Sequence, residues 1–93
     1  LIEVLMLAKR SDNMVDIKTA YKIANDFFLE NDYAGVFEVR ENRECILFKP
    51  KCKKTCYGVS YVAVPKNGDA PYLFNIADET ALDMWKKAKA VLV

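Results

Sequence analysis

The stretch VFEVRENRECILFK, residues 36–49, decides the fold. In its first part, Val36–Glu41, successive side chains alternate between two faces of different polarity, which is typical of a half-buried strand. Asn42–Arg43 can make a turn, and Glu44–Lys49 is a second strand with a dense apolar run. Pro50 lacks a backbone donor and is expected to end that strand. The stretch therefore predicts an antiparallel hairpin.

Two further strands are expected after the hairpin. Gly58–Val64 is rich in β-branched and aromatic residues and predicts the third strand. Pro65–Asp69 contains the dipeptide Asn67-Gly68, which accepts the positive φ angles of tight hairpin turns. Tyr72–Ile76 alternates again and predicts the fourth strand. Together with the hairpin, these segments predict a four-stranded antiparallel meander.

Helical periodicity flanks the meander on both sides. The first helix is expected to begin after Asp16, whose carboxylate suits an N-cap, and to end near Asn31 and Asp32, with Gly35 opening the next element. Asp78 is expected to cap a second helix that continues toward the C-terminal residues. The predicted buried stripes are Ile17, Ala20, Tyr21, Ala24, Phe27 and Phe28 in the first helix, and Ala81, Leu82, Trp85, Ala88 and Leu92 in the second.

The order helix, meander, helix predicts the α+β class, with one sheet face covered by helix and the other partly open. The chain of 93 residues is 53% hydrophobic, which fits a small folded domain over residues 14–93. Its longest apolar run, Val4–Ala8, is far below the roughly 20 residues of a membrane span, and no signal-peptide pattern precedes it. We therefore expect a cytoplasmic protein without a membrane partner.

The sequence contains no histidine. This excludes histidine-based triads, Cys–His dyads and zinc sites that need an imidazole. Carboxylate pairs such as Glu30 with Asp32 and Asp78 with Glu79 lie at predicted helix ends, where capping and solvation account for them. We expect no catalytic residues, no metal and no cofactor, and hence not an enzyme.

Two of the three cysteines, Cys52 and Cys56, enclose a lysine-rich segment that we expect to be exposed. Neighbouring ammonium groups stabilise thiolates, so Cys52 and Cys56 are candidate reactive thiols of a redox sensor or a disulfide clip. Three cysteines cannot all pair within the chain, and reduced thiols are the default expectation. The alternative is a purely structural role, and Cys45 is expected to pack as a small hydrophobe.

Residues 49–68 hold five basic and no acidic side chains. Lysines that contact phosphate and tyrosines that stack on bases are the parts of a single-strand nucleic-acid binder. Glu38, Glu41 and Glu44 on the adjoining hairpin would repel phosphate, so a solvated loop is the alternative. An exposed sheet face with tyrosines such as Tyr72 would instead favour protein binding. The candidate partner-binding residues are Lys49, Lys51, Lys53, Lys54, Tyr57 and Tyr61.

The segment Ala20–Phe28, followed by a meander in which Val64–Gly68 turns before an aromatic strand, resembles small bacterial immunity-protein and PepSY-like domains. The resemblance covers most of residues 15–90 in layout and shares a generic Lys-Asn-Gly hairpin. It implies a cystatin-like fold, a helix packed on an antiparallel sheet, and a domain that neutralises or regulates a partner protein. It identifies no functional residue, and the segment Cys52–Cys56 departs from the pattern. A homodimer, a nucleic acid and redox sensing remain the alternatives.

Residues 1–13 leave two alternatives open. Met14 directly precedes the first helical pattern, and codons for Lys9–Met14 can include a purine-rich ribosome-binding stretch, which favours a translated leader. Ile2–Leu7 can instead form a genuine strand at the sheet edge.

Deletion of residues 1–13 is expected to leave a folded domain, because Asp16 can cap the first helix without help from upstream residues. Thermal unfolding of the full and truncated chains should give closely similar melting temperatures. A truncated chain that is molten or insoluble would show instead that Ile2–Leu7 is a strand of the sheet.

Overall fold

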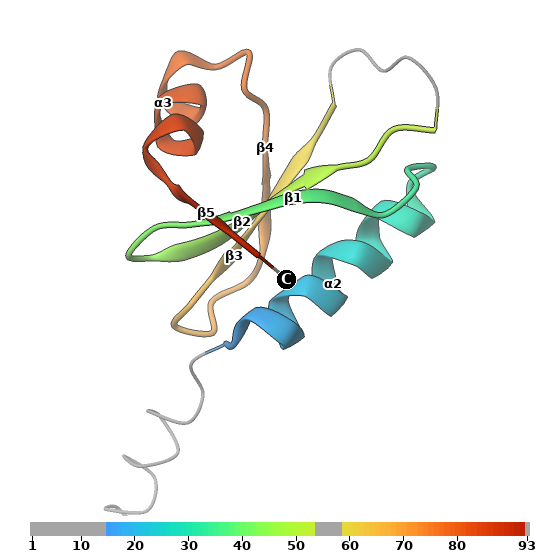
Figure 1. The fold of residues 1–93 in the computed structure, drawn as a ribbon, viewed down its shortest axis with the longest axis horizontal. Helices are drawn as coiled ribbons and strands as arrows, with labels where there is room; N and C mark the ends of the chain where they lie inside the picture. Colours follow the sequence, from blue (N-terminus) through green and yellow to red (C-terminus); the bar gives the residue numbers. More distant parts are fainter. Residues whose placement is uncertain (1–14, 54–58, 93) are drawn as a thin grey trace, which may run out of the picture.

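The computed structural model describes residues 15–53 and 59–92 (Figure 1). In these residues five antiparallel strands form one sheet in the order β4-β3-β2-β1-β5, and the two helices described lie on opposite sides of it. This confirms the α+β class and the antiparallel sheet, but the sheet has five strands rather than the four that were predicted. The elements are α2 (Ile17–Glu30), β1 (Val36–Glu41), β2 (Cys45–Pro50), β3 (Tyr61–Pro65), β4 (Tyr72–Phe74), α3 (Glu79–Lys87) and β5 (Lys89–Val91).

The ends of α2 are where the sequence predicts them. The backbone N–H of Thr19 donates to Asp16 Oδ1 at 2.8 Å, which caps the first turn. Hydrogen bonds from the backbone and the side chain of Thr19 lower the pKa of Asp16, because they favour its charged form. At the other end the helix stops at Glu30, and Asp32 takes a φ of 70°. The chain thus leaves the helix through a left-handed residue, as helices commonly do.

The connection from α2 to β1 depends on Gly35. Its φ is 106°, a value that side-chain-bearing residues rarely adopt. A Cβ at this position would lie 2.7 Å from Oδ1 of Asn25. The same Asn25 oxygen accepts the backbone N–H of Val36 at 3.3 Å, which ties the start of β1 to the helix. Glycine therefore permits both the turn and the close approach of the strand to α2.

The predicted hairpin is confirmed by the pairing of β1 with β2. In the turn, Asn42 Oδ1 accepts the backbone N–H groups of Glu44 at 2.8 Å and of Cys45 at 2.7 Å. The register shifts by one residue between Val36 and Glu38, which is a β-bulge. Pairing of β2 with β3 and of β3 with β4 completes the predicted meander.

The main core lies between α2 and one face of the sheet, here named the α2 face. Ala20, Ala24 and Phe28 of α2 are completely buried. They confirm the predicted stripe of the first helix, and its other members, Ile17, Tyr21 and Phe27, pack against the same cluster. The sheet contributes Val39, Ile46, Phe48, Val62 and Val64.

A second, smaller core lies on the opposite face, here named the α3 face. Trp85 is 6% exposed and meets the ring of Tyr61 edge to face, with centroids 5.0 Å apart. The guanidinium carbon of Arg40 lies 4.5 Å from the centre of the Trp85 ring. Arg40 also donates to the Trp85 carbonyl oxygen at 2.9 Å and to Glu38 Oε2 at 2.8 Å. The predicted burial of Trp85 against the sheet is confirmed.

The predicted length of the last helix is wrong. α3 ends at Lys87, and Ala88 takes an extended conformation with a ψ of 149°. The chain then forms β5, which pairs antiparallel with β1 and sets Val91 opposite Val39 in the main core. Leu92, predicted to be buried on the helix, is fully exposed. Pairing with β5 gives hydrogen-bond partners to the backbone groups along the outer edge of β1. A longer α3 would leave these groups without strand partners.

Trp85→Ala is expected to destabilise the domain by about 3–5 kcal/mol, because it leaves a cavity under α3 and removes the partner of Arg40. Leu92→Ala, at an exposed position of the same segment, is expected to stay within about 0.5 kcal/mol of the parent. Chemical denaturation followed by circular dichroism measures both. Equal effects of the two substitutions would contradict the role assigned to Trp85.

Candidate functional site

β4 is one of the two outer strands of the sheet, and it exposes large apolar side chains. Tyr72 is 45% exposed and Leu73 is 52% exposed. Leu73 pairs with Val62, a member of the main core, and so lies on the α2 face. Tyr72 pairs with Ala63, a member of the second core, and so lies on the α3 face. Among the described residues the outer side of β4 has no strand partner.

An apolar groove lies beside β4 on the α2 face. Its volume is about 170 Å³. Ile23, which is 38% exposed, and Phe27 contribute from α2, and Leu73 contributes from β4. The complete lining of this apolar groove is Ile23, Phe27, Val62, Pro71, Tyr72 and Leu73.

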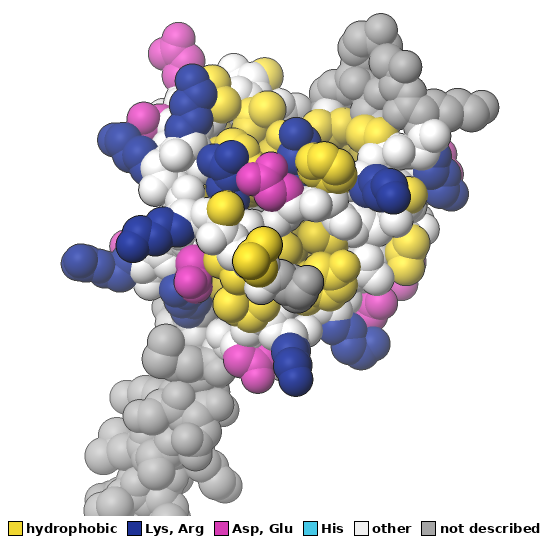
Figure 2. All heavy atoms as spheres, viewed as in Figure 1, with side chains coloured by type: hydrophobic (Ala, Val, Ile, Leu, Met, Phe, Trp, Pro, Cys, Tyr) yellow, Lys and Arg dark blue, Asp and Glu magenta, His cyan; other side chains and the backbone are white. Residues whose placement is uncertain are grey.

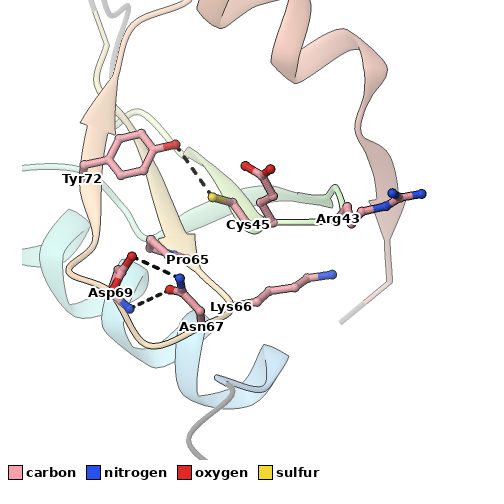
Figure 3. A pocket seen from close by; sticks show the side chains of 8 residues that line it. Arg43, Cys45, Pro65, Lys66, Asn67, Asp69 and Tyr72 are labelled. Atoms are coloured by element: carbon pink, nitrogen blue, oxygen red, sulfur yellow. Dashed lines mark hydrogen bonds between the residues drawn. The ribbon is translucent and has the colours of Figure 1, made fainter. Parts of the chain in front are cut away.

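A polar hollow of about 490 Å³ lies beside the turns that connect β1 with β2 and β3 with β4 (Figure 3). The hydroxyl of Tyr72 lies 3.7 Å from the Sγ atom of Cys45 at one side of it. Asn67 and Asp69 are joined by two hydrogen bonds, which brace the β3–β4 turn. The complete lining of this polar hollow is Arg43, Glu44, Cys45, Pro65, Lys66, Asn67, Asp69 and Tyr72.

The charges of the polar hollow nearly balance. It is lined by two cationic and two anionic side chains, those of Arg43, Lys66, Glu44 and Asp69. Lys66 forms an ion pair with Glu41 at 3.1 Å. The hollow therefore has no strong preference for a ligand of either sign.

Tyr72 lines both the apolar groove and the polar hollow. Partial burial raises the pKa of its hydroxyl, and the hydrogen bond with Cys45 raises it further. The negative charge of Glu44 acts in the same direction. Tyr72 therefore stays protonated at neutral pH, and its hydroxyl lies against Cys45 Sγ at the side of the hollow.

The predicted basic residues do not form one surface. Lys49 lies over the exposed ring of Phe37, with its Nζ atom 5.3 Å from the ring centre. Lys51 is exposed, and Lys53 forms an ion pair with Asp32 at 3.3 Å. Lys54 and Tyr57 lie outside the described residues, and the buried Tyr61 contacts Phe74 and Trp85. Lys66 belongs to the same basic stretch, and its backbone N–H donates to the carbonyl oxygen of Glu44 at 2.8 Å. Glu44 directly precedes β2 and Lys51 directly follows it, so Lys66 lies at the other end of that strand.

The cysteines differ in their environments. Cys45 is 6% exposed and packs in the second core, which confirms its predicted role as a small hydrophobe. Cys52 is partly buried and disulfide-bonded. Cys56, the other candidate reactive thiol, lies outside the described residues. In this oxidised form Cys52 is not a nucleophilic thiolate.

A second exposed apolar surface lies around the end of β5. Figure 2 shows hydrophobic side chains gathered there, with lysine, arginine and acidic side chains around them. Leu92 is fully exposed at this end of the chain. The candidate site is instead assigned to β4, because two cavities adjoin this one outer strand.

Within residues 15–53 and 59–92, no group of three or more acidic or cysteine side chains is arranged to hold a metal ion. Neither helix in this part of the chain has the length and apolarity needed to cross a bilayer. Comparisons with protein-family models, curated proteins and solved structures find no match to the chain. What the candidate site does must therefore be inferred from its geometry.

None of the residues that line the apolar groove is among the predicted partner-binding residues, and Ile23 and Leu73 show why. Ile23 lies outside the predicted stripe of the first helix, and Leu73 was assigned to a strand without a role. An isoleucine off the buried stripe is itself a signal, because it predicts an apolar side chain on the solvent side of the helix. Nothing in the sequence indicates that Ile23 and Leu73 line the same groove, since 50 positions in the chain separate them.

Tyr72→Phe is expected to reduce the loss of stability at alkaline pH. The raised pKa means that folded Tyr72 holds its proton more tightly than unfolded Tyr72. Its contribution is fully present below the unfolded pKa of about 10 and is lost as the pH rises through the higher folded pKa. Denaturant unfolding of both proteins at pH about 8 and about 11 measures the difference. Tyr61, whose pKa burial also raises, remains in the variant and accounts for a residual loss.

If Tyr72→Phe and the parent lose the same free energy of unfolding between these two pH values, Tyr72 does not have a raised pKa in the folded protein.

Proposed function

We propose that this chain is a small protein-binding domain that holds its partner at the β4 edge. One observation carries the proposal: an outer strand with exposed Tyr72 and Leu73 lies beside an apolar groove that also exposes Ile23. Exposed outer strands usually carry charged residues that prevent pairing with other chains. β4 has the sequence Tyr-Leu-Phe and carries no charge, whereas the other outer strand, β5, begins with Lys89. An uncharged outer strand beside an apolar groove is suited to binding another protein.

The proposal extends to a cytoplasmic immunity or regulatory protein of bacterial type, acting on a partner protein. Support comes from the order of α2 followed by the antiparallel meander, since a cystatin-like layout packs one helix on such a sheet. A disulfide at Cys52 that persists in cells would contradict the cytoplasmic location, because disulfides are rare there. Alkylation in living cells before mass spectrometry would measure its redox state.

The two alternative functions have less support. Lys53 and Lys66 are engaged in ion pairs, and the buried Tyr61 has no surface on which a base can stack. This leaves a nucleic-acid binder with few free contacts among the described residues. The disulfide at Cys52 would be the oxidised state of a thiol sensor, and a fixed disulfide clip would contain the same bond.

The proposal can be tested with a library of displayed random peptides selected on the immobilised protein. Leu73→Lys should weaken binding of the selected peptides by at least about tenfold, because it places a charge at the mouth of the groove. Leu29→Lys is the matched control, since Leu29 is 54% exposed on α2 but does not line the groove. It should change binding by no more than about twofold.

Circular dichroism confirms that each variant is folded before binding is measured. A selection that yields no peptide sensitive to Leu73→Lys would overturn the assignment of the β4 edge as a protein-binding site. An equal loss of binding in both variants would also overturn this assignment, because the loss would then not depend on the apolar groove.

A further inference from the structure

The turn between β3 and β4 contains the dipeptide Asn67-Gly68, and both of its residues are exposed. Asn67 alone among the asparagines of the chain precedes a glycine. Its side chain is folded back on Asp69 (Figure 3). Oδ1 of Asn67 accepts the backbone N–H of Asp69 at 2.9 Å, and Nδ2 donates to Asp69 Oδ2 at 3.1 Å. The carboxamide is thereby held against the backbone of its own turn.

We propose that Asn67 is a site of spontaneous deamidation, a covalent modification that goes beyond the proposed function. The backbone nitrogen of Gly68 attacks Cγ of Asn67 and gives up its proton. The Cγ–Nδ2 bond breaks, the leaving nitrogen takes up that proton, and ammonia departs from a succinimide ring. Solvent water then opens the ring at either of its carbonyl groups. The product at position 67 is aspartate or isoaspartate, and no electrons are transferred.

The conformation of the turn favours the attack. The hydrogen bond from the Asp69 N–H to Asn67 Oδ1 closes a ring of atoms that includes both Cγ and the Gly68 nitrogen. The side chain is therefore already bent toward the atom that attacks it. The Gly68 N–H donates to the carbonyl oxygen of Pro65 at 3.4 Å. This is longer than the roughly 2.7–3.2 Å of a good hydrogen bond, so the attacking nitrogen is only weakly held.

Two other asparagines share the hydrogen bond of Asn67 but not its neighbour. Oδ1 of Asn42 and Oδ1 of Asn75 each accept the backbone N–H two residues further on, both at 2.8 Å. The residues that follow them are Arg43 and Ile76, whose side chains crowd the nitrogen that would attack. The residue after Asn67 has no side chain and takes a φ of 91°. The local hydrogen bond is thus matched, and the access to the nitrogen differs.

Deamidation is expected to loosen the turn that carries β4. A carboxylate at position 67 has no N–H to donate to Asp69, and it adds a negative charge beside that side chain. Isoaspartate also adds a methylene group to the backbone, which a tight hairpin turn does not accommodate without a change of shape. β3 is the only strand that pairs with β4 among the described residues. A change in this turn therefore acts directly on the pairing of β4.

The first test follows the intact, folded protein at neutral pH by peptide mapping and mass spectrometry. Asn67 should be converted at least about tenfold faster than Asn42 or Asn75, because each tenfold in rate needs only about 1.4 kcal/mol of barrier. A free peptide of residues 65–70 gives the rate without the fold. The folded protein should react within about tenfold of that peptide.

Two variants test the role of the following residue. Gly68→Ala should slow the conversion of Asn67 at least about tenfold, since a Cβ then crowds the attacking nitrogen. Arg43→Gly, at an exposed position of the β1–β2 turn, should accelerate the conversion of Asn42 by a similar factor. Circular dichroism shows whether each variant is folded. Arg43→Gly keeps the test decisive if Gly68→Ala alters its own turn.

The consequence for β4 is measured on aged protein that anion exchange separates into intact and deamidated fractions. Amide hydrogen exchange at Asp69 and in β4 should be at least about tenfold faster in the deamidated fraction. Equal exchange in the two fractions would overturn the loosening of the turn. Conversion of Asn67 no faster than that of Asn75 would overturn the site itself. So would a folded protein that stays intact while the free peptide reacts, because the hydrogen bonds to Asp69 would then protect the amide.

Discussion

The contact of Arg40 with Trp85 is the interaction on which the rest of the structure depends. Arg40 lies on β1 in the middle of the chain, and it both covers the Trp85 ring at 4.5 Å and donates to the Trp85 carbonyl oxygen. The hydrogen bond from Arg40 gives a second donor to this carbonyl of the last turn of α3, which also accepts the backbone N–H of the C-cap residue Ala88 at 3.3 Å. A nine-residue helix with one large buried side chain is thereby held on the sheet.

The position of α3 determines which edge of the sheet is closed. Because α3 ends above β1, the residues that follow it reach the outer side of β1 and pair there as β5. β4, at the other end of the sheet, keeps an outer side without a strand partner in the described part of the chain. The apolar groove borders that strand on the α2 face, and the polar hollow extends from Tyr72 across the sheet to Cys45 of β2. The candidate site thus lies at the sheet edge that the C-terminal segment leaves open.

Most local structure was predictable because local chemistry determines it. Asp16 and Asp78 cap their helices, and Asn42 accepts two backbone N–H groups in the hairpin turn. The fifth strand was not predictable, because Lys86–Val91 consists mainly of lysine and alanine, which favour helix, and continues the apolar spacing of α3. Pairing with the β1 edge outweighs that helical preference. The burial of Tyr61 was not predictable either, because it depends on contact with the distant Trp85. Tyr61 was predicted at a partner-binding surface, and that prediction is wrong.

The sequence by itself determined the α+β class, the helix caps, the hairpin, the buried stripe of α2 and the exclusion of histidine chemistry. The absence of histidine is a property of the composition and the class follows from the order of the elements, whereas the caps, the hairpin and the buried stripe depend on residues within a few positions of one another. Tertiary structure alone decided the fifth strand, the separation of Lys66 from the other lysines and the meeting of Ile23 with Leu73. Each of these depends on which strand edges and faces find partners, and that is settled only when distant segments compete for the same backbone groups and the same apolar surface.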